Sequence, residues 1–206
     1  GIANLTALPA NDDPVTGFDV GPANSLMDLW TDRHLGAPYD DSGSWAATGA
    51  VDDDLLEQLL GDPWFEREPP KSTGFEYFNA AWLEQHDLAG LPPENVQATL
   101  VELTALSTAS AIERWAPSTT ALYVCGGGAH NRTLLTALER RLPSCTVATT
   151  ATAGLDPDWV EAAAFAWLAA RTLSGEAGSL ASVTGASRDT VLGGIYSPAP
   201  VEPRTG

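Results

Sequence analysis

The stretch YVCGGGAHNRTLLTALERRLP, residues 123–143, joins a short apolar run to an amphipathic segment through three consecutive glycines. The apolar run predicts a strand, and the segment from Arg132 predicts a helix with Asn131 as its N-cap. Glycines let a ligand approach the main chain and the positive end of the helix. A tight turn without a ligand fits Gly126, Gly127 and Gly128 equally well. The pattern is neither GxGxxG nor GxxxxGK(S/T), so no dinucleotide-binding fingerprint and no P-loop is present.

The segments on either side extend this unit. Residues 121–125 and 146–149 predict two strands, with the helix 132–141 between them. A long helix is predicted over 93–115, where apolar residues recur at helical spacing. A second apolar helix is predicted over 157–173. The chain therefore contains a strand–loop–helix–strand unit that is bordered by helices.

The beginning of the chain has a different pattern. The apolar runs 2–8 and 15–18, joined by the turn sequence PANDDP, predict a hairpin. A helix follows the sequence GPAN, with Asn24 or Ser25 as its cap. Hairpin, helices and then strand–loop–helix–strand are typical of an α/β protein, with one mixed sheet flanked by helices.

Composition narrows the possible partners and sites. The 206 residues carry a net charge of −17, which argues against nucleic acid and anionic membranes but leaves room for a phosphorylated ligand. Cys125 and Cys145 form no metal-binding pattern, and we interpret them as reduced and structural, as in a cytoplasmic protein. The three histidines suggest neither a catalytic triad nor a metal site, and we assign no metal ligand. No apolar run is long enough to span a membrane, and no signal peptide is visible.

The stretch GFDVGPAN places Asp19 where a predicted strand enters a Gly-Pro turn. A carboxylate at the end of a strand can act as a general base or organise metal-bound water. Spacing alone favours the simpler interpretation, in which Asp19 accepts hydrogen bonds from the amides of the turn.

Glu161 is the only charged residue in WVEAAAFAWLAA, residues 159–170. A carboxylate that borders an apolar helix face needs a partner or a function. Two arrangements remain open. Asp158 and Glu161 match the D-x-x-E pattern of a capping box. Alternatively, Asp156 is the cap, Pro157 takes the first helical position, and Glu161 lies inside the helix.

The stretch PPKSTGFEYFN, residues 69–79, contains Lys71, the only lysine of the chain. A Lys-Ser-Thr-Gly loop can bind phosphate or sugar hydroxyls, and it can equally be a solvated loop.

Seven blocks occur in the order found in the C-terminal half of the 1,6-anhydro-N-acetylmuramate kinases. The chain resembles this family over nearly its whole length. The blocks are GIANLT, GFDVGPANSLMDLW, GAPYDDSGSWAATG, PPKSTGFEYFN, VCGGGAHNRTLL, GLDPDWVEAAAFAWLA and GSLASVTGA…VLGGIY.

The resemblance implies a fold and an activity. The family belongs to the sugar kinase/Hsp70/actin superfamily, whose members bind a nucleotide between two ribonuclease-H-like domains. It implies that ATP and Mg²⁺ are used on 1,6-anhydro-N-acetylmuramic acid. The anhydro ring is cleaved by water and the 6-oxygen is phosphorylated, which gives N-acetylmuramic acid 6-phosphate during peptidoglycan recycling in the bacterial cytoplasm. It also implies a homodimer.

Residue roles carry over at the matching positions. Asp19 matches the family's catalytic base, which activates the attacking water. Glu161 matches a carboxylate near the sugar, and we expect it to position the substrate together with Asn24.

The nucleotide residues carry over in the same way. The glycines 126–128 match the loop at the adenosine end of the nucleotide, with Asn131 after it. Gly1 and Asn4 match the remainder of a second phosphate-contacting hairpin, with Gly21 nearby.

Two departures from the family pattern bear on activity. The Ser-Gly-Thr-Ser-type phosphate loop of the family's N-terminal half has no counterpart here, and the chain opens on GIAN with no Met. We therefore expect residues 1–206 to be one actin-like domain of a longer two-domain kinase, with its own N-terminal domain as a partner and no activity alone.

Phe75 stands where the family pattern leads us to expect a basic residue. The rival hypothesis is a nucleotide-binding or regulatory module that has this fold without the chemistry.

Overall fold

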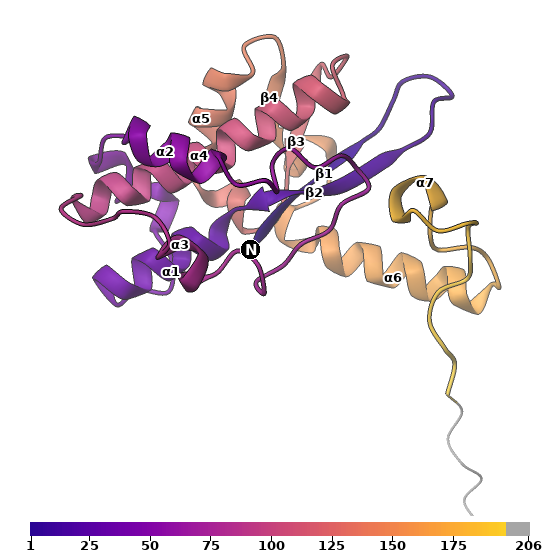
Figure 1. Ribbon diagram of the computed structural model, residues 1–206. Coiled ribbons are helices and arrows are strands. Elements are labelled where there is room, and N and C mark those ends of the chain that lie inside the picture. The colour runs from indigo at the N-terminus through magenta and orange to yellow at the C-terminus, as the bar shows by residue number, and fades with distance from the viewer. Residues whose placement is uncertain (197–206) are drawn as a thin grey trace, which may run out of the picture.

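Two pairs of strands and a buried helix organise residues 1–196, the part of the chain that the computed structural model describes (Figure 1). The strands are β1 (Ile2–Ala7), β2 (Thr16–Pro22), β3 (Ala121–Val124) and β4 (Thr146–Thr149). The helices are α1 (Asn24–Leu35), α2 (Asp53–Leu60), α3 (Ala80–Leu83), α4 (Pro93–Trp115), α5 (Arg132–Arg141), α6 (Val160–Leu173) and α7 (Ala181–Thr184). The α/β class and the predicted order of strands and helices are confirmed.

The strands form two sheets instead of the single mixed sheet that we predicted. β1 pairs with β2 in antiparallel orientation, and β3 pairs with β4 in parallel orientation. Among the described residues, no backbone hydrogen bond of a sheet joins the two pairs. Leu5 and Phe18 of the first pair pack in one hydrophobic cluster with Leu122 of the second and Ile112 of α4. Side chains, rather than a continuous ladder, therefore hold the sheets together.

The hairpin differs from its prediction at one position that matters for function. β2 continues to Pro22, four residues beyond the predicted end, so Asp19 lies inside the strand and not at its exit. Ala3 pairs with Gly21 but Asn4 pairs with Asp19, so the register shifts by one residue at Val20. Such a bulge turns the neighbouring side chains and increases the local twist.

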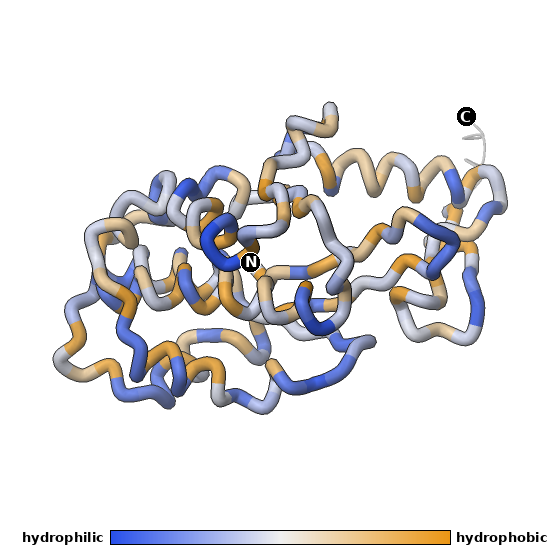
Figure 2. Tube along the Cα trace, turned by 90° about the horizontal axis from the view of Figure 1, so that it is seen from above, coloured by the Kyte–Doolittle hydropathy of each residue, from blue (hydrophilic) through white to orange (hydrophobic). Residues whose placement is uncertain are grey.

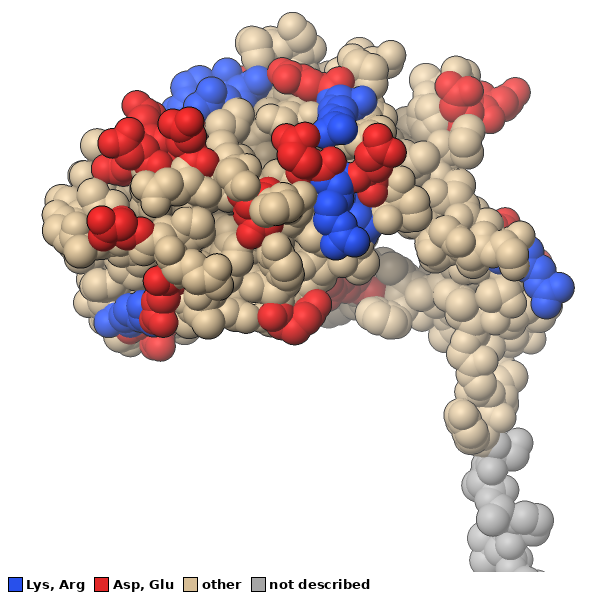
Figure 3. All heavy atoms as spheres, in the orientation of Figure 1, with Lys and Arg blue, Asp and Glu red and all other residues tan. Residues whose placement is uncertain are grey.

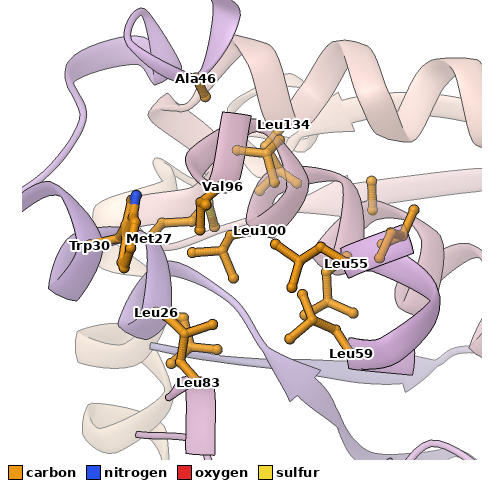
Figure 4. Close-up of a cluster of buried hydrophobic side chains, with 14 of the residues drawn as sticks. Leu26, Met27, Trp30, Ala46, Leu55, Leu59, Leu83, Val96, Leu100 and Leu134 are labelled. Atoms are coloured by element: carbon orange, nitrogen blue, oxygen red, sulfur yellow. The ribbon is translucent and has the colours of Figure 1, made fainter. Parts of the chain in front are cut away.

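Helix α4 is the centre of the core and keeps both predicted ends, Pro93 and Trp115. Side chains of α1, α2, α3 and α5 pack around it (Figure 4). Leu100 and Leu103 of α4 are 1% and 0% exposed. Thr104 of α4 donates a hydrogen bond to the carbonyl of Pro22 (3.1 Å), which fixes the end of β2 against the core.

Helix α6 projects away from this core (Figure 1), and none of its residues is buried. Much of its length is hydrophobic (Figure 2), with Phe165, Trp167 and Leu173 each more than half exposed. Asp156 caps the turn before it by accepting a hydrogen bond from the N–H of Asp158, and Pro157 takes the first position of that turn. The second arrangement predicted for Glu161 is therefore the correct one. Within residues 1–196, no helix has both the length and the apolar character needed to cross a membrane.

The carboxylate of Glu102, on α4, joins α4 to α5. Its side chain is 4% exposed, and it accepts hydrogen bonds from Arg140 and from Arg141, whose Nε lies 2.6 Å away. We expect Glu102→Gln to lower the free energy of unfolding by about 1–3 kcal/mol, because charge-assisted hydrogen bonds to a buried carboxylate are lost. Glu113→Gln, on an exposed position of the same helix, should change it by less than about 0.5 kcal/mol. Urea denaturation of both variants measures the free energy of unfolding, and equal losses would contradict a stabilising role for the buried carboxylate.

Candidate functional site

A cavity of about 750 Å³ opens where the glycine loop meets the start of α1. Ligand pockets in proteins are commonly of this size. Its lining comes from three segments that are far apart in the sequence: the first turns of α1, the turn before Gly43, and the residues from Gly127 to Leu135, which are the glycine loop and the start of α5. The lining residues are Asn24, Met27, Asp28, Tyr39, Asp40, Asp41, Ser42, Gly127, Ala129, His130, Asn131, Arg132 and Leu135.

The glycine loop forms a 3-10 turn, Gly127–His130, before α5 begins. Gly126 enters this turn at φ 68° and ψ −168°, a conformation that is essentially open to glycine alone. Its N–H donates to the carbonyl of Pro157 (3.0 Å), which ties the loop to the segment before α6. Asn131 then caps α5, as predicted, by accepting a hydrogen bond from the N–H of Leu134 (3.0 Å).

Asn24, at the start of α1, lies directly against the glycine loop at the cavity wall. A Cβ on Gly127 would lie 2.7 Å from the Nδ2 of Asn24, so the absent side chain leaves room for this approach. The predicted cap role of Asn24 or Ser25 is wrong, because the cap position is Ala23 and no side chain caps the helix. Instead the carbonyl of Gly1 accepts hydrogen bonds from the N–H groups of Ala23 (3.0 Å) and Ser25 (3.1 Å). The side chain of Asn24 is thus not used by the helix.

Three aspartates, one arginine and one histidine line the cavity, so acidic side chains predominate among its charged groups. Acidic side chains are also spread over the face of the molecule shown in Figure 3. Asp40 is held by the N–H groups of Trp45 (2.8 Å) and Ala46 (2.9 Å). Burial raises the pKa of Asp28. Carboxylates repel phosphates but accept hydrogen bonds from hydroxyl and amino groups. The wall therefore suits the sugar and base of a nucleotide better than its phosphates.

His130 and Glu161 lie at the edges of the glycine loop. His130 pairs with Asp158 at 2.8 Å, and this hydrogen bond raises the pKa of the imidazole. The pKa of the Cys125 thiol is raised by burial and also by the negative charge of Glu161, which places that carboxylate near the end of β3. Glu161 belongs to the first turn of α6 and is exposed, and it does not line the cavity.

Asp19 lies on the hairpin, outside the lining of the cavity. It is directly opposite Asn4 in the register of the sheet, so the two side chains share one face. Their neighbours Leu5 and Phe18 are buried on the other face. The Oδ2 of Asp19 accepts hydrogen bonds from the backbone N–H of Thr73 (2.8 Å) and the hydroxyl of Ser72 (2.9 Å). These donors belong to a distant loop and not to the Gly-Pro turn. The simpler interpretation, in which Asp19 accepts hydrogen bonds from the amides of that turn, is therefore wrong.

The predicted nucleotide residues fall into two neighbouring groups. The glycine loop and Asn131 lie at the cavity, next to Asn24, which was predicted to position the substrate. Gly1 and Gly21 lie where the open end of the hairpin joins α1. Sequence reasoning missed Asp28 and the turn from Tyr39 to Ser42. The signal was the sequence YDDSGS, whose acidic and small residues are typical of a turn, but nothing local indicated which helix it would face.

No group of three or more His, Cys, Asp or Glu residues within the described part of the chain could hold a metal ion. Mg²⁺ in kinases is held largely by substrate phosphates and waters, with one or two carboxylates. A metal ion that is held in this way needs no such group of protein ligands.

Gly126 offers a test of the loop. We expect Gly126→Ala to weaken ADP binding about tenfold. An alanine at this position would need roughly 1–3 kcal/mol to adopt the backbone conformation that Gly126 has. The new methyl group meets no atom within 4 Å, so the effect would come from the backbone alone. Gly175→Ala, at φ 68° beyond α6 and also in open space, is the matched control. Calorimetric titration measures both, and an unchanged affinity in Gly126→Ala would exclude the loop from the nucleotide site.

Comparison of the sequence with known proteins identifies the family. The model of the family "Anhydro-N-acetylmuramic acid kinase" matches residues 1–198. An anhydro-N-acetylmuramic acid kinase of Xanthomonas oryzae pv. oryzae is 53% identical over 197 residues, which cover 95% of this chain and 52% of the relative. Relatives of the same name from Chromohalobacter salexigens and Burkholderia orbicola are 51% and 52% identical over 203 residues, covering 96% and 95% of this chain and 55% and 53% of their own lengths.

The chain spans about half the length of the curated relatives that it matches. The match itself extends over residues 1–198 and therefore covers every candidate site residue, including those of the hairpin, α1, the glycine loop and α6. On this basis the chain belongs to the anhydro-N-acetylmuramic acid kinase family.

Proposed function

We propose that residues 1–206 form the nucleotide-binding C-terminal half of a kinase that opens and phosphorylates 1,6-anhydro-N-acetylmuramic acid. The observation that carries the proposal is the position of the cavity. Asn24, which lies against the glycine loop at the cavity wall, comes two residues after the end of β2, the strand that presents Asp19. One short segment thus connects a nucleoside-sized cavity to a half-buried carboxylate.

The reaction that we propose consumes one water and one ATP. Asp19 accepts a proton from the water that attacks the anomeric carbon, and the bond between that carbon and the 6-oxygen breaks. The freed 6-oxygen takes the γ-phosphoryl group, which gives N-acetylmuramic acid 6-phosphate and ADP. Mg²⁺, when bound, neutralises charge on the phosphates. Positioning of the three reactants accounts for much of the rate.

The roles of the remaining residues follow from where they lie. The glycines 126–128 and Asn131 hold the adenosine end of ATP, while Gly1, Asn4 and Gly21 approach its phosphates. We propose that Glu161 and Asn24 position the sugar. Because Glu161 lies near Cys125 rather than beside Asp19 in this chain, its role depends on how α6 is placed in the complete protein.

We further propose that the complete protein has the two-domain, ribonuclease-H-like architecture of the actin-like ATPases. Within residues 1–196, β1 pairs only with β2 and β3 only with β4, so each pair keeps a free edge. α6 has no buried residue although it is strongly apolar. Free edges and an uncovered apolar helix are expected of a domain that packs against further chain. A cytoplasmic homodimer is part of the proposal, and light scattering of the complete protein tests it.

ADP release tests the proposed function against the rival. The complete protein, with Mg²⁺ and ATP, should form ADP only when 1,6-anhydro-N-acetylmuramic acid is added. N-acetylmuramic acid, which has no anhydro ring, is the matched control. A nucleotide-binding or regulatory module would bind ATP and release no ADP in response to the sugar.

A further inference from the structure

The Lys71–Gly74 loop makes the only side-chain hydrogen bonds of Asp19 among the described residues. Ser72 Oγ and Thr73 N both donate to Oδ2, at 2.9 and 2.8 Å. The backbone N–H of Asp19 donates in return to the carbonyl of Lys71 (3.0 Å). Loop and strand thus hold each other through three hydrogen bonds, and Oδ1 accepts none from the described residues.

A buried lysine anchors this loop. The Nζ of Lys71 donates to the carbonyl of Trp64 (3.2 Å) and lies 5.1 Å from the centre of the Trp64 ring. Lys71 is 9% exposed, and burial lowers its pKa, with further lowering by Arg114 and Arg67. The sequence left open whether this loop binds phosphate or is solvated. The ammonium group of Lys71 does neither in this structure, because it faces the protein interior.

Trp64 and Lys71 also contact Val20 and Phe18, the two sequence neighbours of Asp19. Trp64 is 2% exposed, and its indole N–H donates to the carbonyl of Val20 (2.9 Å). The Nζ of Lys71 lies 6.0 Å from the ring centre of Phe18. The loop is therefore fixed to the same strand whose carboxylate it contacts, which leaves Asp19 little freedom to rotate.

This arrangement suits a general base. A base must present one lone pair to the water, and a carboxylate that rotates freely presents it only part of the time. Two donors on Oδ2 fix the plane of the carboxylate and leave Oδ1 as the acceptor. We propose that Ser72 and Thr73 are positioning residues that orient Asp19 toward the attacking water. This inference rests on the proposed role of Asp19.

Ser72 can be tested by substitution in the complete protein. Ser72→Ala should lower kcat about tenfold and leave the KM values for ATP and sugar within about twofold, because a hydrogen bond to a charged group is lost away from both substrates. Ser72→Thr keeps a hydroxyl at an exposed position and should restore most of the rate. Ser118→Ala, another exposed serine, should have no effect.

A double-mutant cycle separates positioning from general structural damage. In the Asp19→Asn background, Ser72→Ala should cost little further, because the base that it orients is already gone. An equal loss in both backgrounds would overturn the proposal, and so would an unchanged kcat in Ser72→Ala. If Asp19→Asn is inactive while Ser72→Ala is fully active, the function stands and the positioning role fails.

A second readout does not depend on turnover. The amide of Thr73 should exchange with deuterium at least about tenfold faster in Asp19→Ala than in the wild type, because it loses its acceptor. The amide of Leu134, bonded to Asn131, should not change. Equal exchange of Thr73 in both proteins would overturn the proposed contact even if no sugar kinase activity were found.

Discussion

We expect Asp19→Asn to lower kcat of the complete protein by about 10²–10⁴-fold while the affinity for ATP stays within about twofold. General-base catalysis typically contributes an effect of this size. An amide has nearly the same shape as the carboxylate, and its oxygen can still accept hydrogen bonds from Ser72 and Thr73. It cannot take a proton from water at neutral pH. Steady-state rates and calorimetric titration measure the two quantities.

The control for this variant is on the same hairpin. Asp12 is exposed in the turn between β1 and β2, so Asp12→Asn removes the same charge at a distance from the strand position. Its kcat should equal that of the wild type. Full turnover by Asp19→Asn would remove this residue from the role of base, and a parallel loss of ATP affinity would instead indicate a damaged fold.

The second large effect concerns the chain by itself. We expect residues 1–206 alone to show no sugar-dependent ADP formation. Phosphoryl transfer depends on donors and charges placed around the γ-phosphate, and the cavity of this chain is walled by Asp28, Asp40 and Asp41, which suit the nucleoside end. Besides Gly1, Asn4 and Gly21, the phosphates would need further partners from the other half.

Two measurements test this expectation. Sugar-dependent ADP formation should return when the N-terminal half is supplied as a separate polypeptide. Binding of a dye specific for exposed apolar surface should be strong for residues 1–206 and fall on that addition, because Phe165, Trp167 and Leu173 are exposed on α6. Turnover by residues 1–206 without the other half would contradict the proposed division of the site.

The elements that could be predicted are those with local causes. The ends of α4 follow from a proline at its first position and an apolar pattern that stops at Trp115. The cap of α5 follows from Asn131, whose side chain reaches an amide three residues on. The strand, the glycine loop and the helix are likewise predicted by a change of pattern within residues 123–143.

What could not be predicted depends on contacts between distant residues. The carbonyl of Gly1 takes the capping role that the sequence suggested for Asn24 or Ser25. β2 continues through the Gly-Pro step because Gly21 pairs with Ala3. The donors to Asp19 come from residues 53 and 54 positions away, and no local pattern indicates such a partner.

Contacts between distant residues also explain why the pairing of the strands was not predicted. Strand patterns predict strands, but they do not say which edges meet. The prediction of one mixed sheet therefore required a pairing between the hairpin and β3 that is not made within residues 1–196. The uncovered α6 is the corresponding case for a helix, since its apolar sequence predicts burial and the described residues leave it exposed.

The mass of the product tests the central claim most directly. The complete protein would be incubated with ATP, Mg²⁺ and 1,6-anhydro-N-acetylmuramic acid, and the sugar product weighed by mass spectrometry. A sugar that has gained one phosphoryl group and one water, and is not formed by Asp19→Asn, is the result that we predict. A sugar that has gained the phosphoryl group without water, or no phosphorylated sugar while ATP still binds, would contradict the proposal that Asp19 activates water in a ring-opening kinase.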